Sequence, residues 1–190
     1  MVQPVSNSIL DSQTGYTLKR VNYQYDLISG NVNKVYYQKN EPDQFIHKYN
    51  YDADNRIVSV ETSNNNIVWE KDATYEYYNH GPLARVVLGD KKVQGVDYAY
   101  TLQGWLKNVN SENLANENKD MGTDGNYVSK DAFGYSLSYF NGDYAARHLG
   151  TNQANSVSAN SAFQGVELFN GNINRMITSV RNTSEDVLPT

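Results

Sequence analysis

The chain of 190 residues contains no cysteine, which excludes disulfide bonds, thiolate metal sites and a cysteine nucleophile. Basic residues are also scarce, because 16 Lys and Arg stand against 21 Asp and Glu and no basic run occurs. Nucleic-acid binding needs a clustered cationic surface, so the composition argues against it. No apolar stretch approaches the length of a membrane span. The first residues lack the basic and apolar segments of a secretory signal peptide.

Tyrosine is abundant instead. The chain has 16 tyrosines, while apolar residues make up 39% and charged residues 19% of it. A tyrosine offers a large apolar ring and a hydroxyl that can stay in contact with water, so it suits a half-buried strand. The composition therefore predicts a core of aromatic rings packed over β-sheet.

The tyrosines recur in one frame. The clearest copy, residues 47–60, has the sequence H-K-Y-N-Y-D-A-D-N-R-I-V-S-V and predicts a strand, a turn and a second strand. Its second tyrosine returns at intervals of 26, 26 and 23 residues (51 − 25, 77 − 51 and 100 − 77), which is typical of a repeat array. The frame consists of that tyrosine (Tyr25, Tyr51, Tyr77, Tyr100), a turn residue suited to positive φ (Gly30, Asn55, Gly81, Gly104) and a branched apolar residue two positions later (Val32, Ile57, Leu83, Leu106).

Each copy also carries a valine three residues after the branched apolar residue, as Val60 follows Ile57. In a regular strand, residues three apart face opposite sides of the sheet. Either both faces are partly covered, or a β-bulge shifts the register. We favour partial cover on both faces.

Four segments follow from the pattern. Residues 1–15 are polar and predict an irregular lead-in, and residues 16–110 hold the four hairpins. Residues 111–130 are rich in Asn, Glu, Asp and Gly and predict a polar loop or a short helix. Residues 131–190 predict degenerate repeat strands with a flexible loop at 149–162, where small polar residues dominate. The predicted fold is all-β, an array of consecutive antiparallel β-hairpins.

The second copy carries a family resemblance. Its stretch Y-N-Y-D-A-D-N-R-I, residues 49–57, resembles the tyrosine–aspartate (YD) repeat of RHS-type proteins, and the copies around Gly81 and Gly104 look like variants from Bacteroidetes-type bacteria. In that family, long arrays of such hairpins form a spiralling β-sheet that closes as a hollow shell around a variable C-terminal toxin or other effector. The chain has no D-P-x-G segment like the one at the family's autocleavage boundary.

The resemblance implies a structural segment of a shell wall with no catalysis of its own. Its partners would be the remainder of the shell and an effector or toxin domain. It would be secreted or displayed at the cell surface as part of a longer protein. The alternative is a surface-exposed β-repeat module that binds carbohydrate.

Few residues favour catalysis or metal chemistry. Asp26 and Asp52 follow the tyrosine pair in two copies, but the other two copies have Tyr78 and Thr101 there. We therefore expect carboxylates that cap turns rather than a catalytic pair. The three histidines, at positions 47, 80 and 148, do not have metal-ligand spacing. We predict no enzyme activity, no cofactor and no metal.

Two sets of residues are candidates for binding. Asp120, Asp124 and Asp131 partly match a calcium loop, although a glycine occupies its third position and its last ligand is a short aspartate, so a plain acidic loop is expected. Trp69 lies outside the repeat frame and is a candidate for stacking on a sugar ring. The tyrosines of the frame should instead pack on one another across strands.

Overall fold

The computed structural model describes residues 19–112, 114, 121, 127–144 and 166–181. The predicted lead-in at 1–15 and the predicted loop at 149–162 lie outside these residues. The described part contains ten strands and no helix. The strands are β1 (Val21–Tyr25), β2 (Val32–Tyr37), β3 (Phe45–Tyr51), β4 (Ile57–Ser63), β5 (Glu70–Tyr77), β6 (Leu83–Leu88), β7 (Gln94–Tyr100), β8 (Leu106–Val109), β9 (Phe133–Ser138) and β10 (Arg175–Val180).

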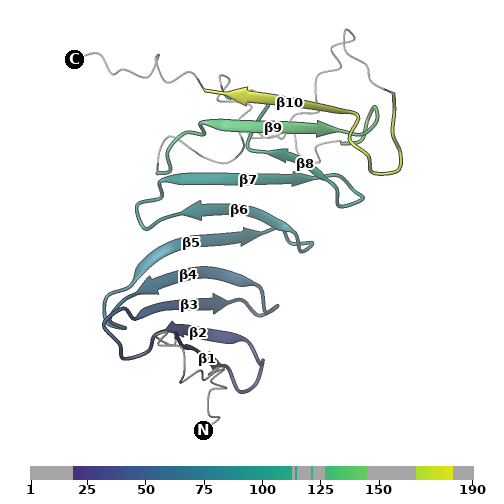
Figure 1. Ribbon diagram of the computed structural model, residues 1–190. Coiled ribbons are helices and arrows are strands. Elements are labelled where there is room, and N and C mark those ends of the chain that lie inside the picture. The colour runs from purple at the N-terminus through teal and green to yellow at the C-terminus, as the bar shows by residue number, and fades with distance from the viewer. Residues whose placement is uncertain (1–18, 113, 115–120, 122–126, 145–165, 182–190) are drawn as a thin grey trace, which may run out of the picture. The chain divides into compact units, whose positions relative to one another are not determined.

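Hydrogen-bonded strands follow one another in chain order from β1 to β10 (Figure 1). Neighbours in the sequence are thus neighbours in the sheet, and the described pairings are antiparallel. Since β1 and β10 do not pair, the sheet is open. The predictions of an all-β fold and of consecutive antiparallel hairpins are confirmed.

The chain divides into two compact units. Unit 1 consists of residues 1–75 and 88–90, and unit 2 of residues 76–87 and 91–190. Unit 1 therefore holds β1 to β4 and most of β5, whereas unit 2 holds β7 to β10 and all of β6 except its last residue.

The repeat frame coincides with the strand boundaries. Each frame tyrosine is the last residue of an odd-numbered strand, and each branched apolar residue is the first residue of the strand that follows it. The turn residues between them have positive φ, including 84° at Gly104 and 62° at Asn55. This is the left-handed region that glycine adopts freely and asparagine tolerates. The frame therefore encodes the hairpin turn and its two flanking strand ends.

Aspartate stabilises the same turns in two copies. Asp52 Oδ1 accepts hydrogen bonds from the backbone N–H groups of Asp54 and Arg56, both at 2.9 Å. Asp26 Oδ1 accepts likewise from Ile28 and Ser29, at 3.0 and 2.8 Å. These donors hold the pKa of both carboxyls below the ordinary value, led by the N–H of Arg56 for Asp52. The capping role predicted for both aspartates is confirmed.

A β-bulge follows each turn for which the register is described. Tyr49 lies opposite Val60 and Tyr51 opposite Ile57, so the strand after the turn contains one extra residue. Both apolar residues therefore face the same side as the two tyrosines. The same offset occurs in the first and fourth copies. The bulge, and not our preferred explanation of partial cover on both faces, accounts for the three-residue spacing, while residues on either face of β4 are half-buried.

The last hairpin, β9–β10, has the register of the repeat but a long connection. Leu137 lies opposite Met176, as Tyr49 lies opposite Val60. Tyr139 and Ile173 then correspond to the frame tyrosine and the branched residue, with 33 residues (140–172) between them in place of the usual short turn. The fifth copy is thus a repeat whose turn carries an insertion.

The core of unit 2 is unusually polar. Lys107 and Asn108 of β8 and Ser136 of β9 are each about 1% exposed. Asn108 lies directly opposite Ser136 across the strand pair. Two apolar residues of the segment after β8 are also buried, Leu114 at 1% and Met121 at 7% exposure, and Met121 packs with Ala99 of β7. Most of the segment 111–130 lies outside the described residues.

Candidate functional site

The tyrosine hydroxyls connect successive hairpins. Tyr51 donates its hydroxyl hydrogen to the carbonyl oxygen of Val32, 2.8 Å away in the preceding copy. Tyr139, at the equivalent position of the fifth copy, donates to the carbonyl oxygen of Leu106 at 2.7 Å. Burial raises the pKa of both phenols. Tyr51 and Tyr139 therefore act as structural links between successive copies.

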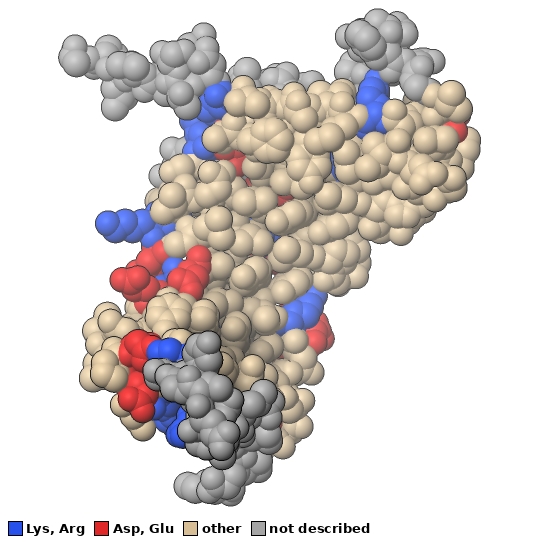
Figure 2. Space-filling model, in the orientation of Figure 1, with Lys and Arg blue, Asp and Glu red and all other residues tan. Residues whose placement is uncertain are grey.

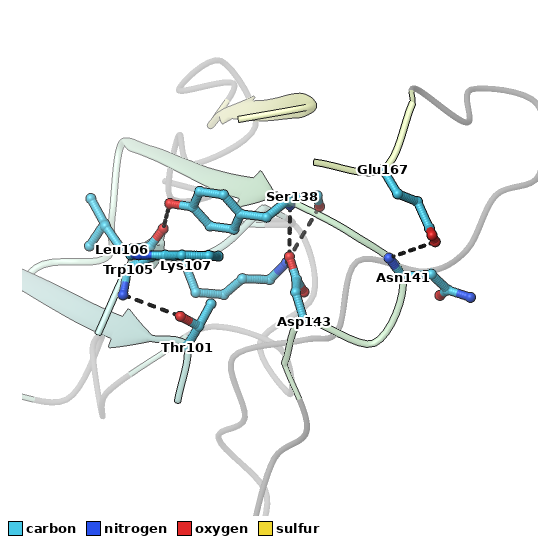
Figure 3. Close-up of polar contacts among 9 residues, drawn as sticks. Thr101, Trp105, Leu106, Lys107, Ser138, Asn141, Asp143 and Glu167 are labelled. Atoms are coloured by element: carbon cyan, nitrogen blue, oxygen red, sulfur yellow. Dashed lines mark hydrogen bonds and ion pairs between the residues drawn. The ribbon is translucent and has the colours of Figure 1, made fainter. Parts of the chain in front are cut away.

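A buried pair of opposite charges in unit 2 lies where the fifth copy is interrupted (Figure 3). Lys107 is the extra residue of the β8 bulge, since the register passes from Leu106 to Asn108 between adjacent partners on β7. Its ammonium lies 2.8 Å and 3.1 Å from the two carboxylate oxygens of Asp143. The side chains are 1% and 6% exposed. This is a buried ion pair between β8 and the start of the insertion.

Two further groups form hydrogen bonds with this ion pair. The backbone N–H of Tyr139 donates to Asp143 Oδ2 at 2.9 Å, and Ser138 Oγ lies 3.4 Å from Lys107 Nζ. Taking two charges out of water is costly unless each meets its partner and further hydrogen bonds. The arrangement meets that condition and fixes Asp143 against the sheet.

The rest of the insertion stem is held by packing around the same place. The rings of Phe140 and Phe169 stack with centroids 4.8 Å apart, and the N–H of Asn141 donates to Glu167 Oε1 at 3.2 Å. At its end, Gly171 approaches the indole of Trp105 so closely that a Cβ there would lie 3.2 Å from two ring carbons. The entering and returning arms of the insertion are thus fastened to each other and to the repeat array.

Trp69 lies in unit 1 beside two lysines. The ammonium groups of Lys34 and Lys48 are 4.9 and 5.4 Å from the centroid of its ring, within the range of cation–π attraction. The two lysines occupy directly opposite positions on β2 and β3. Glu61 lies on the other side of Lys48 and forms an ion pair with it at 2.8 Å. The half-buried indole therefore covers a row of charged side chains.

The calcium candidates do not form a described site. Asp131 is fully buried, and its Oδ1 accepts a hydrogen bond from the amide of Gln94 at 2.7 Å. Asp120 and Asp124 lie outside the described residues. Among the described residues, no group of three or more His, Cys, Asp or Glu is placed to hold a metal ion.

The histidines that the structure describes make ring contacts. His47 lies between Phe45 and Tyr49 on β3, with centroid distances of 5.0 and 6.4 Å. His80 stacks on Tyr78 at 5.2 Å. His148 lies outside the described residues. These contacts belong to the packing of strands and turns.

Sequence reasoning missed the ion pair of Lys107 and Asp143. The sequence did mark Lys107 as unusual. The residue after the branched apolar position is uncharged in the first three copies (Asn33, Val58, Ala84) and charged only in the fourth, where it is Lys107. The partner was not predictable from spacing, since it lies 36 residues away, inside the insertion.

On the face drawn in Figure 2, uncharged residues make up most of the surface, and Lys and Arg residues are scattered rather than clustered. No described helix is long and apolar enough to span a membrane. Comparison of the chain with protein-family models and with curated proteins found no match in either set.

Proposed function

We propose that the chain is a structural segment of an RHS/YD-type shell wall that encloses or presents a C-terminal effector, with no catalysis of its own. The observation that carries the proposal is the repeated hairpin unit. Its frame tyrosine ends one strand and its branched residue begins the next. In two copies, the hydroxyl of this tyrosine donates a hydrogen bond to the preceding copy, from Tyr51 to Val32 and from Tyr139 to Leu106. In a repeat array, each unit packs against the units next to it, so the array is stabilised by the contacts between neighbouring copies.

Two further features support a wall. The sheet grows strand by strand in chain order, so added copies extend it without a change of topology. The bulge after the turn increases the local twist of a strand pair, which favours a curved sheet over a flat one. The interrupted fifth copy places a long connection at one hairpin end, with its stem fixed by Lys107 and Asp143.

The test uses the full-length gene product. We expect further Tyr-x-Tyr copies in its sequence, a hollow particle in electron micrographs, and a C-terminal segment that resists protease until the particle is denatured. Denatured protein is the matched control for intrinsic protease sensitivity. A full-length product without further copies, or a C-terminal segment cleaved as fast in the native as in the denatured protein, would contradict the proposal.

One observation favours carbohydrate binding as a second candidate. Trp69 lies outside the repeat frame, and its ring is flanked by Lys34 and Lys48 together with the polar Asn66, which accepts a hydrogen bond from Lys34 at 2.9 Å. An indole beside amide and ammonium donors has the chemistry that recognises a sugar ring and its hydroxyl groups.

A glycan array on the purified chain tests this candidate. Binding that is lost in Trp69→Ala and kept in Tyr127→Ala would support it. Tyr127 is a suitable control because it is 83% exposed and belongs to unit 2. An array without signal, or equal loss in both variants, would count against a site at Trp69.

A further inference from the structure

The chain has no cysteine, so any covalent link between distant segments must come from other side chains. The insertion of the fifth copy is the place where a link would have most effect, because 33 residues separate Tyr139 from Ile173. The stem is joined to β8 by the contact between Lys107 and Asp143 (Figure 3). An amine and a carboxyl group in contact are the reactants of an amide bond.

The geometry of this pair suits a direct reaction. Lys107 Nζ is within 3.1 Å of both carboxylate oxygens of Asp143, so it faces the carboxylate end and lies next to Cγ. Reacting atoms held together in this way make a bimolecular step effectively unimolecular. The two side chains are 1% and 6% exposed, which excludes most of the water that would compete with or reverse the reaction.

The groups around this pair also favour formation of the amide bond. The backbone N–H of Tyr139, 2.9 Å from Oδ2, is placed to stabilise the oxyanion that develops when the amine attacks Cγ. Ser138 Oγ lies 3.4 Å from Nζ and helps to hold the amine in place.

We propose that Lys107 and Asp143 form an intramolecular isopeptide bond that fastens the insertion of the fifth copy to β8. One ammonium proton moves to the carboxylate, Nζ then bonds to Cγ, and a carboxyl C–O bond breaks. The departing oxygen leaves as water with two of the three ammonium protons, and the third stays on the amide nitrogen. The ion pair supplies every atom, and no oxidant or reductant takes part.

The mass of the intact chain tests the bond. The purified protein, measured under denaturing conditions, should be lighter than its sequence mass by one water. Trypsin does not cleave after an acylated lysine, so the digest should contain residues 93–119 joined to residues 131–147 in one species. A wild-type chain of full sequence mass, with cleavage after Lys107, would overturn the proposal.

Variants distinguish isopeptide formation from other reactions that release water. Lys107→Met and Asp143→Ala should have their full calculated masses, whereas a cyclic imide elsewhere in the chain would keep the loss in both. Asp143→Asn is the conservative variant, because its amide would release ammonia and give the same covalent product as the wild type. A loss of water that persists in Lys107→Met would assign the reaction to another site and refute the isopeptide. The wild-type measurement is decisive even if the variants do not fold.

Discussion

The hydroxyl of Tyr51, at the end of β3, donates a hydrogen bond to the carbonyl oxygen of Val32, at the start of β2, over 2.8 Å. The two residues hold different frame positions in successive copies. Tyr139 repeats the relationship with Leu106 at 2.7 Å. In these two copies, the tyrosine that makes the motif recognisable is therefore also the residue that links one hairpin to the one before it.

Replacing Tyr51 with phenylalanine should remove this link and keep the ring. A net hydrogen bond contributes about 0.5–1.5 kcal/mol, so we expect the free energy of unfolding to fall by that amount. Urea denaturation measures it. Tyr25→Phe is the matched control, since Tyr25 has the same frame position in the first copy and is 44% exposed. Equal losses in the two variants would refute the linking role.

Gly104→Ala should destabilise the turn between β7 and β8 through the backbone alone. Gly104 has a φ of 84°, and a Cβ added there meets no atom within 4 Å. The expected loss is about 1–2 kcal/mol, the cost of a left-handed conformation for a residue with a Cβ. Gly104→Asn should lose less, because asparagine tolerates this region and occupies the same frame position at Asn55. A thermal melt of both variants that ranked them in the opposite order would contradict this account.

Gly171→Ala should cost more than Gly104→Ala. Its φ of 85° imposes the same backbone strain, and its Cβ would also lie 3.2 Å from the ring of Trp105. Overpacking adds about 1–3 kcal/mol where neighbours cannot shift. A double-mutant cycle with Trp105→Leu, followed by urea denaturation, isolates the steric part. Strictly additive losses would show that the two residues do not interact.

Asp52 should make the stability of the chain depend on pH in acid. Its folded-state pKa is lowered by N–H donors of the turn, with the backbone of Arg56 first, so it stabilises the fold above the unfolded pKa of about 3.9. That contribution disappears as the pH falls through the lower folded value. We therefore expect Asp52→Asn to be less stable than wild type at pH 7, with a gap that closes on acidification. Denaturation curves across that range measure it, and a gap that widened would be inconsistent with a lowered pKa.

Much of the fold is predictable because its determinants are local. The turn between Tyr51 and Ile57 depends on a capping aspartate and on Asn55, which all lie within seven consecutive residues. Strand ends, turn positions and the order of hairpins follow from such short stretches and need no knowledge of distant neighbours. The candidate binding residues were less predictable, since Trp69, which precedes β5, lies beside lysines from β2 and β3.

The sequence by itself thus determined the repeat unit, its turn and the consecutive antiparallel array. Only the tertiary structure decided the side of the sheet to which Ile57 and Val60 point, because a three-residue spacing fits either a regular strand or a bulge until the partner strand sets the register. It also decided that Lys107 is buried. The cost of burying this ammonium is offset mainly by the carboxylate of Asp143, which lies 36 residues further along the chain.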